Sequence, residues 1–338
     1  MWYSAIRQAL FALDPERAHR LALEGLRMAG RRALRLPVAT PFHCMGLRFP
    51  NRVGLAAGFD KNAVAIDGLG SLGFGFIEIG TVTPRPQAGQ ALPRLFRLPA
   101  EGALLNRLGF PNEGAAKVAA RLRHKRYRGI VGVNIGKNAD TPTERAIDDY
   151  VACLRAVRGV ADYVAVNISS PNTVGLRDLH SRERLEPLLS ALLEERTHGA
   201  VGAQAGTPLV LKISPDMADE DLRNVSALLK ALPMDGVIAT NTTVSRVGIL
   251  STVSSQAGGV SGPPLHSLAL RVIGALRARL GPAFPIIGVG GIDAPDAALR
   301  LRDAGADLVQ LYTGLVYRGP TLITQCVRAL DRSPKAAA

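Results

Sequence analysis

Eight short apolar segments, alternating with longer stretches of helical pattern, constrain the fold of this chain more than any other feature. Continuous apolar runs of this kind are typical of strands buried on both faces, as in a parallel sheet. Most of the runs precede a stretch with apolar residues three or four positions apart, such as Thr143–Val157 and Asp219–Leu232. Eight such units favour an α/β fold with a closed (β/α)₈ TIM barrel over an open sheet. The predicted strands are Val53–Ala57, Gly75–Ile79, Ile130–Ile135, Tyr163–Ile168, Leu209–Ile213, Gly236–Thr240, Pro285–Gly290 and Leu308–Tyr312.

Two insertions and one unmatched stretch interrupt the repeating pattern. Residues 80–129 are rich in proline, which predicts an elaborated loop before a helix near Glu113–Arg126. The segment Thr242–Pro264 is rich in serine and glycine and is expected to be a mobile cover. The stretch Arg196–Pro208 follows no pattern, and we expect a variable surface loop there.

The N-terminal residues differ from the barrel pattern and predict a separate module over residues 1–40, beside a barrel over residues 41–338. Apolar residues fall on two helical stripes, separated by the helix-start signal Asp14-Pro15. The stripes consist of Trp2, Ile6, Leu10 and Leu13, and of Ala18, Leu21, Ala22 and Leu26. This spacing predicts two short amphipathic helices.

Basic residues decorate this predicted helical hairpin, and the whole chain has a formal net charge of +13. The arginines are Arg7, Arg17, Arg20, Arg27, Arg31, Arg32 and Arg35. Apolar stripes beside positive charge predict peripheral contact with an anionic membrane surface. A hairpin that only packs on the barrel wall is the simpler alternative. Nucleic acid is a less favoured partner, because the charge is spread over many segments and no recognition motif accompanies it.

Composition sets further limits on the compartment and on metal binding. A chain of 338 residues with 47% hydrophobic content can bury a full barrel core. Cys44, Cys153 and Cys326 are far apart and lack metal-type spacing, which predicts reduced, packed thiols and no metal site. No apolar run approaches the roughly 20 residues that span a bilayer, and the N-terminus lacks the apolar core of a signal peptide. We therefore expect a cytoplasmic compartment.

Polar residues gather where the predicted strands end. The fourth strand runs directly into Asn167, Ser169, Ser170 and Asn172, and the C-terminal ends of barrel strands are where active sites form. Ser170 offers a hydroxyl for proton transfer. This loop is the first candidate for an active site.

Glycine-rich loops follow the last two strands, at residues 288–293 and 312–314. Their positions predict a phosphate site in which backbone amides meet the anion. Lys61 and Lys212 can neutralise an electron-rich ring, as a flavin would require. Because an unpaired charge inside the apolar run Leu209–Ile213 is costly, Lys212 is expected to be functional. Neutral hydrogen bonds to such a ring can come from Asn134, Asn167, Thr240 and Asn241.

Seven ordered motifs then identify a family. They are Gly58-Phe59-Asp60-Lys61, Glu78-Ile79-Gly80-Thr81-Val82-Thr83-Pro84-Arg85-Pro86-Gln87, Asn106-Arg107-Leu108-Gly109-Phe110, Asn134-Ile135-Gly136-Lys137-Asn138, Asn167-Ile168-Ser169-Ser170-Pro171-Asn172, Ala239-Thr240-Asn241-Thr242-Thr243 and Gly288-Val289-Gly290-Gly291-Ile292. With the N-terminal run Asp14-Pro15-Glu16-Arg17-Ala18-His19, they resemble the quinone-dependent (class 2) dihydroorotate dehydrogenases, and the match continues to Leu315.

The resemblance implies an enzyme of pyrimidine synthesis with FMN as cofactor. It would oxidise dihydroorotate to orotate and pass the electrons to a membrane quinone, as a monomer held peripherally at the cytoplasmic side of the cell membrane. By resemblance, Ser170 is the base, Thr173 a proton relay and Phe110 a gate. A base on one face of the substrate and a flavin on the other suit the loss of a proton and a hydride from neighbouring carbons.

The remaining site residues are carried over by motif. For FMN they are Ala57, Gly58, Phe59, Asp60, Lys61, Thr81, Asn134, Asn167, Lys212, Thr240, Gly262, Gly291, Tyr312 and Thr313. For dihydroorotate they are Lys61, Asn106, Arg107, Leu108, Gly109, Phe110, Asn167, Asn172, Asn241 and Thr242. For quinone access they are His19, Arg97 and Tyr312.

The resemblance also separates the quinone-dependent type from its relatives. Soluble relatives have cysteine at the base position, whereas Cys153 lies before the fourth strand and cannot replace Ser170. Ala63, where relatives often have glycine, and Thr313, where serine is common, depart from the family pattern without removing a reacting group.

Two other functions are kept as alternatives. A flavin barrel of the transfer-RNA dihydrouridine synthase type would use the basic charge, but it predicts a cysteine acid and a further RNA-binding region. A catalytically silent phosphate-binding barrel on membranes predicts loss of the polar strand ends, yet Ser170, Asn172 and Lys212 are present.

Overall fold

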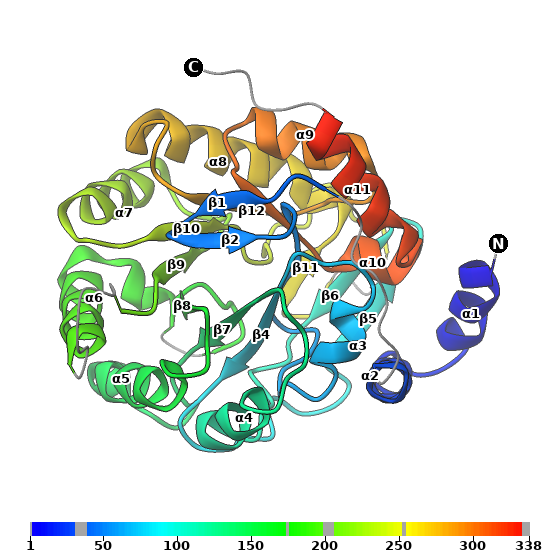
Figure 1. Cartoon of the computed structure of the whole chain (residues 1–338), viewed down its shortest axis with the longest axis horizontal. Helices are drawn as coiled ribbons and strands as arrows, with labels where there is room; N and C mark the ends of the chain where they lie inside the picture. Colours follow the sequence, from blue (N-terminus) through cyan, green and yellow to red (C-terminus); the bar gives the residue numbers. More distant parts are fainter. Residues whose placement is uncertain (1, 31–38, 174–175, 199–205, 252–254, 333–338) are drawn as a thin grey trace.

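The computed structural model describes residues 2–30, 39–173, 176–198, 206–251 and 255–332. Within these residues, eight parallel strands form a closed barrel, which confirms the predicted fold (Figure 1). Its closure is made by the first and last strands, where Val309 pairs with Val53. In chain order the strands are β3 (Val53–Leu55), β4 (Phe76–Val82), β7 (Ile130–Ile135), β8 (Tyr163–Asn167), β9 (Leu209–Ile213), β10 (Gly236–Ala239), β12 (Ile286–Val289) and β13 (Leu308–Leu311).

Most of the strands end slightly earlier than the apolar runs predict. Thr240 directly follows β10 and Tyr312 directly follows β13, and the backbone amide of Thr240 still donates to the carbonyl of Val289 at 2.8 Å. In contrast, β4 continues beyond the predicted Ile79, because Val82 pairs with Ile135 of β7 after a register shift. The residues that follow the strands are those available to a site.

Helices surround the barrel, as Figure 1 shows. They are α3 (Ile66–Gly70), α4 (Ala115–Leu122), α5 (Ala146–Val157), α6 (Arg182–Thr197), α7 (Asp219–Ala231), α8 (His266–Leu280), α9 (Pro295–Asp303), α10 (Thr313–Arg318) and α11 (Thr321–Arg332). Helix α7 matches the expected Asp219–Leu232 to one residue and buries its apolar face, including Leu222 and Val225. The expected helix over 143–157 begins as the 3₁₀ turn Thr143–Arg145 before α5. Short 3₁₀ turns also occur at Arg177–His180 and Pro263–Leu265.

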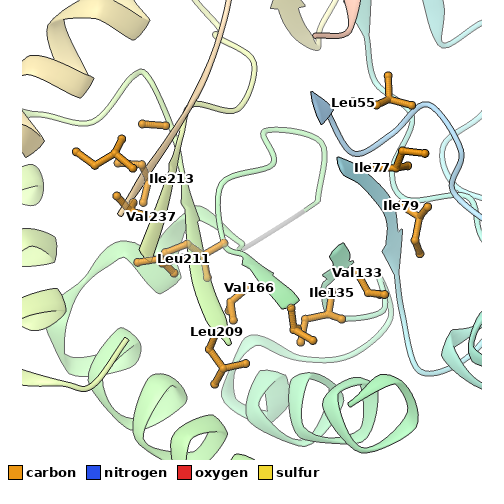
Figure 2. Packing of buried hydrophobic residues seen from close by; sticks show 14 of the residues in the cluster. Leu55, Ile77, Ile79, Val133, Ile135, Val166, Leu209, Leu211, Ile213 and Val237 are labelled. Atoms are coloured by element: carbon orange, nitrogen blue, oxygen red, sulfur yellow. The ribbon is translucent and has the colours of Figure 1, made fainter. Parts of the chain in front are cut away.

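Alternation along each strand divides the core into two layers. On β4, Ile77 and Ile79 belong to the layer between strands and helices, part of which Figure 2 shows. Phe76, on the opposite face of the same strand, belongs to the layer inside the barrel. By the same period of two, Glu78 points inward. The barrel interior therefore receives a charged residue from an otherwise apolar strand.

A small hairpin at the N-terminal end of the barrel was not anticipated from the sequence. Strands β1 (Phe42–Cys44) and β2 (Leu47–Phe49) pair in antiparallel fashion, and the turn between them has positive φ at both Met45 and Gly46. Phe49 is fully buried against Phe76, with ring centroids 5.3 Å apart. Strands of three residues are too short to produce a recognisable alternation, so the pattern gave no signal.

The two predicted insertions form one antiparallel sheet rather than two separate loops. Strands β5 (Leu95–Leu98) and β6 (Ala103–Asn106) make a hairpin, and β11 (Gly259–Ser261) pairs with β6 through Val260 and Leu105. The expected cover over 242–264 is thus partly a strand; residues 252–254 lie outside the described residues. Most of the expected loop over 196–208 also lies outside them. The sheet pairs a segment after β4 with one after β10.

Two helices at the N-terminus, α1 (Trp2–Phe11) and α2 (Pro15–Ala29), confirm the predicted helical hairpin. Figure 1 shows them beside the barrel, outside its ring of helices. The hydroxyl of Tyr3 donates to the carbonyl of Val316 at 2.7 Å, and Arg7 donates to the carbonyl of Tyr317 at 2.8 Å. Of the predicted basic residues, Arg31, Arg32 and Arg35 lie outside the described residues. No described helix combines the length and the apolar character needed to cross a bilayer.

Candidate active site

A cavity opens where the barrel strands end, and residues from the loops after several strands line it. Nineteen residues predicted for catalysis, cofactor or substrate lie in its wall. They are Ala57, Gly58, Lys61, Thr81, Asn106, Leu108, Gly109, Phe110, Asn167, Ser170, Asn172, Lys212, Thr240, Asn241, Thr242, Gly262, Gly291, Tyr312 and Thr313.

The other predicted residues lie behind or beside this wall. Asp60 is fully buried and accepts hydrogen bonds from the backbone amides of Val64 and Ala65 at 3.0 and 2.7 Å, so it shapes the loop that carries Lys61. Burial raises the pKa of Asp60, while these hydrogen bonds oppose the rise. Outside the cavity wall are also Phe59, Arg107, Asn134, Thr173, His19 and Arg97.

A buried ion pair lies at the bottom of the cavity, inside the barrel. Lys212 Nζ lies 3.1 Å from Glu78 Oε1, and the side chain of Glu78 is fully buried. The charge of Lys212 within the apolar run Leu209–Ile213 is therefore paired, because β4 supplies the Glu78 carboxylate as its counter-charge. The sequence analysis assigned no role to Glu78. A charged residue inside an apolar strand was the signal that could have identified it as the partner of Lys212.

Neutral donors complete the surroundings of Glu78. Its Oε1 also accepts from Asn134 Nδ2 at 2.8 Å, and its Oε2 accepts from Gln310 Nε2 at 2.7 Å and from the hydroxyl of Tyr163 at 3.1 Å. Burial beside the Glu78 carboxylate raises the pKa of Tyr163 far above its usual value, which keeps this hydroxyl protonated. Satisfying a buried carboxylate with several donors fixes the position of each of them.

Gln310 is a candidate ligand contact that the sequence analysis missed. Its side chain is 1% exposed and lies in the cavity wall. Because Nε2 donates to Glu78, the orientation of the amide is set, and Oε1 has no hydrogen-bond partner among the described residues. A buried acceptor without a partner is costly, and a ligand with an N–H or O–H group would satisfy it. A glutamine inside the apolar run Leu308–Tyr312 was the available signal.

Asn167 connects the two sides of the cavity. Its Nδ2 donates to Thr81 Oγ1 at 3.0 Å and to Asn134 Oδ1 at 3.1 Å. Its Oδ1 accepts from Ser169 Oγ at 3.0 Å and from Asn241 Nδ2 at 3.3 Å. Four strand ends are joined in this way, so Asn134, Asn167 and Asn241 belong to one network.

The loop after β8 brings Ser170 to the cavity. Ser170 is buried, and its Oγ accepts from the backbone amide of Asn172 at 3.3 Å. Asn172 Nδ2 in turn donates to Asn106 Oδ1 at 3.3 Å, which joins this loop to the end of β6. Phe110 also lies in the wall, with a positive φ of 55°. Thr173 is buried in the same loop but does not reach the cavity wall.

Small residues close the opposite side of the cavity, after β12 and β13. Gly291 has a φ of 69°, and a Cβ there would come within 2.5 Å of His266 Cβ, so packing alone already requires glycine. The hydroxyls of Ser261 and Thr313 lie 2.7 Å apart. Ser261 also lines the cavity and was not predicted. Hydroxyl groups and accessible backbone amides are a donor set that suits a phosphate.

Lys61 lies between this cavity and the N-terminal helices. Its Nζ donates to the carbonyl of Gly58 at 2.7 Å. Burial lowers the pKa of the Lys61 ammonium to about 8. Burial and the neighbouring Lys61 charge together lower the pKa of His19 to about 3, so His19 is neutral at physiological pH.

A second cavity, of about 440 Å³, lies between α1, α2 and the barrel. Apolar side chains dominate its lining, and all three residues predicted for quinone access, His19, Arg97 and Tyr312, lie in its wall. Arg97 donates to the carbonyls of Leu10 and Leu13 at 3.1 and 2.8 Å, so it caps the end of α1. The two cavities share the wall residues Leu95, Leu104 and Tyr312.

Comparisons with known proteins agree with this arrangement. The family described as "Dihydroorotate dehydrogenase" matches residues 40–333. The chain is 50% identical to the dihydroorotate dehydrogenase (quinone) of Marinobacter nauticus, over 98% of this chain and 99% of that protein. It is 49% identical to the enzyme of the same name from Pseudomonas fluorescens, over 99% of this chain and 100% of that protein. The match includes the N-terminal helices.

Solved structures give the same result for the fold. The dihydroorotate dehydrogenase of Eimeria tenella in complex with ferulenol superposes with a TM-score of 0.87 at 35% identity, covering 94% of this chain and 90% of that chain. The ligand-free enzyme from the same organism gives a TM-score of 0.86 at 35% identity, covering 94% of each chain.

Proposed function

The chain belongs to the dihydroorotate dehydrogenase family and is an enzyme of the quinone-dependent type, and from this we propose that it uses FMN as its flavin and Ser170 as its base. The family implies a flavin cofactor; the choice of FMN, the assignment of individual residues and the route of the quinone are the proposal. One observation supports it most. The cavity at the strand ends brings Ser170, the connected amides and the buried Lys212 together.

The wall of this cavity fits a flavin mononucleotide. Lys212 would stand beside the electron-rich end of the ring, and the unsatisfied Oε1 of Gln310 would accept a hydrogen bond from it. Gly291 and Thr313 would meet the phosphate at the opposite side. When bound, the flavin supplies the hydride acceptor that no amino-acid side chain can provide.

Proton removal is the step assigned to this chain's own residues. Dihydroorotate loses a proton from one ring carbon and a hydride from its neighbour. Ser170 Oγ would take the proton, and because a serine hydroxyl is a weak base at neutral pH, the proton must pass onward. Thr173, buried three residues along the same loop, is the proposed relay. Phe110, in the cavity wall, is the proposed gate.

Substrate positioning follows from the amide network. Asn106 and Asn172 are hydrogen-bonded to each other, and Asn241 is bonded to Asn167, so two pairs of amides face the cavity. Amide groups both donate and accept, which matches the alternating N–H and C=O groups of a pyrimidine ring. The Lys61 ammonium would balance the substrate carboxylate. These contacts orient the reacting carbon toward Ser170.

The quinone would occupy the second cavity. Its apolar lining suits the ring and tail of a quinone, and it shares the wall residues Leu95, Leu104 and Tyr312 with the cavity that would hold the flavin. Dihydroorotate and quinone would then react at different places. The proposed product, orotate, makes this a step of pyrimidine biosynthesis.

Contact with a membrane would deliver the quinone to this cavity. Exposed apolar residues project from both N-terminal helices, including Ile6 and Leu21. Arg17 and Arg20 are exposed on α2, where positive charge favours an anionic lipid surface. We propose peripheral attachment at the cytoplasmic side, with the chain acting as a monomer.

Anaerobic absorbance of the purified protein tests this function. Dihydroorotate should bleach the flavin band, and a short-chain quinone added afterwards should restore it. Chemical analysis of the released flavin should identify FMN. Oxidised flavin that persists in excess dihydroorotate would refute the substrate assignment, and release of a flavin other than FMN would refute the cofactor assignment.

A further inference from the structure

An ion pair joins the N-terminal module to the substrate side of the barrel. Arg94, just before β5, donates from Nε to both carboxylate oxygens of Glu16 at 3.2 and 3.1 Å, and from Nη2 to Oε1 at 3.1 Å. The two side chains are only 13% and 24% exposed. Bidentate pairs of arginine and carboxylate have a defined geometry, and partial burial protects them from screening by salt.

The start of α2 fixes the position of Glu16. Asp14 accepts hydrogen bonds from the backbone amides of Glu16 and Arg17 at 3.1 and 3.0 Å, and Pro15 occupies the first helical position. This is a stable helix start, because side-chain capping satisfies otherwise free amides. Glu16 is therefore presented on a rigid helical turn rather than on a loose loop.

Arg94 also organises the segment that precedes β5. Its Nη1 donates to the carbonyls of Ala88 and Gln90 at 2.6 and 2.8 Å. Its own carbonyl accepts from the backbone amide of Arg107 at 2.8 Å. One guanidinium thus holds residues 88–94 in a closed loop while its backbone holds the segment after β6.

The loop over residues 88–94 in turn contacts both segments proposed to bind dihydroorotate. Gln90 Nε2 donates to the carbonyl of Asn172 at 3.2 Å, in the loop that carries Ser170. The backbone amide of Gln90 donates to the carbonyl of Leu108 at 3.0 Å. The side chain of Gln90 also packs on Gly109, where an added Cβ would come within 2.7 Å of its Cγ.

We propose that Glu16 and Arg94 are positioning residues for dihydroorotate, so that the N-terminal module takes part in substrate binding as well as in quinone binding. The inference rests on the proposed function, because it concerns the substrate side of the same site. Neither residue lines the cavity over the barrel strands. They act by holding the loop over 88–94, which holds Leu108, Gly109 and Asn172.

The charge of Glu16 has a second effect on the same site. Lys61, which lines the cavity, has its pKa lowered mainly by burial, and the neighbouring carboxylate of Glu16 opposes this shift. Glu16 therefore helps to keep the Lys61 ammonium charged, whereas Arg94 acts in the opposite direction. Loss of Glu16 would weaken both the loop and this positive charge.

Two charge-neutralising variants on the same helix separate this role from a general effect of charge. Glu16→Gln removes the partner of Arg94, while Glu24→Gln removes an exposed carboxylate whose ion-pair partner among the described residues is Arg27 of its own helix. Orotate affinity is measured from its perturbation of the flavin spectrum, and flavin reduction by dihydroorotate from anaerobic stopped-flow traces. Glu16→Gln should weaken orotate binding by about tenfold, the scale expected for losing a charge-assisted hydrogen bond.

The separation of binding from turnover identifies a positioning role. In Glu16→Gln the KM for dihydroorotate should rise while the limiting rate of flavin reduction changes little, and Glu24→Gln should match the wild type in both. Arg94→Met should weaken orotate binding through the loop alone, because loss of the Arg94 charge favours the Lys61 ammonium. Glu16→Asp should recover part of the affinity.

Amide hydrogen exchange tests the proposed effect on the loop over 88–94 without any ligand. Amide hydrogen exchange in residues 86–92 and 105–110 should be faster in Glu16→Gln than in Glu24→Gln. Unchanged orotate affinity in folded, flavin-loaded Glu16→Gln and Arg94→Met would overturn the inference. A wild-type protein that binds orotate but is not reduced by dihydroorotate would instead refute the proposed reaction, leaving the binding comparison intact.

Discussion

The two cavities of this enzyme are built on opposite principles although they share a wall. The cavity at the strand ends has a bottom of buried polar groups, in which Glu78 accepts from four donors on four strands. The cavity under the N-terminal helices is mostly apolar, and its polar groups include Arg7, His19 and Arg97. Arg97 is occupied in capping α1.

This difference teaches how one chain serves two unlike substrates. Directional hydrogen bonds inside a barrel allow one orientation of a small polar ring, as hydride and proton transfer require. Apolar contacts are non-directional, and they tolerate a ligand that enters from a lipid phase and leaves again. The proposed function therefore places the orientation of dihydroorotate and the exchange of quinone in different parts of the molecule.

Removing the carboxylate under the polar cavity should have the largest effect. In Glu78→Gln the buried Lys212 ammonium loses its counter-charge, and breaking a buried pair in this way costs about 3–5 kcal/mol. Urea unfolding should show this loss, whereas Glu24→Gln, in an exposed pair, should unfold like the wild type. Equal stability of the two variants would mean that the barrel interior is more hydrated than its burial indicates.

Removing the proposed base should affect only the polar cavity. Ser170→Ala is expected to slow flavin reduction by dihydroorotate about 10²-fold or more, with flavin content and quinone reoxidation preserved. Stopped-flow absorbance measures both half-reactions. Ser214→Ala is a matched control, since Ser214 is a buried serine after β9 that does not line the cavity. Wild-type reduction rates in Ser170→Ala would assign the proton to another group.

Filling the apolar cavity should give the opposite result. Ala22→Phe adds a ring inside the second cavity, and a loss of about 1.4 kcal/mol in quinone binding would make reoxidation by quinone roughly tenfold slower. Flavin reduction should be unchanged. Leu21→Phe, at an exposed position on the same helix, serves as the control. If Ala22→Phe left reoxidation by a short-chain quinone intact, the electrons would have to leave by another route.

The smallest expected effect is a dependence of the reaction with dihydroorotate on pH, which would come from Lys61 in the polar cavity. The pKa of Lys61 is lowered to about 8, so its ammonium is charged below that pH and is lost as pH rises through it. The kcat/KM for dihydroorotate should therefore be flat below pH 8 and fall by up to about tenfold per pH unit above it. Lys61→Arg should flatten the profile, because arginine stays charged. A profile that is flat in the wild type up to pH 10 would exclude Lys61 from carboxylate binding.

The sequence predicts the barrel because its strands and helices repeat a local pattern. It also identifies Lys212, since a charge inside an apolar strand is costly without a partner. The partner is not predictable in the same way: Glu78 lies 134 residues away, and only the closure of the barrel brings the two together. Gln310 and Tyr163 join the same group for the same reason.

Other features could not be predicted from the spacing of apolar residues. Strands β1 and β2 are too short to show alternation, and β11 pairs with β6 across about half of the chain. The second cavity depends on how far α1 and α2 stand from the barrel, which no stripe of apolar residues specifies. At Ala63, in contrast, the sequence analysis noted a departure from glycine that the structure explains. The φ of Ala63 is 58°, a conformation that suits glycine, and the fold accommodates alanine there.

Because α1 and α2 supply much of the lining of the apolar cavity, most of its shape can vary without touching the reaction chemistry. An inhibitor that fills it would meet residues such as Leu10 and Ala22, which contact no reacting group. Substitutions there would change the affinity for such an inhibitor while leaving flavin reduction by dihydroorotate intact. Compounds that discriminate between related enzymes would therefore be expected to act in this cavity.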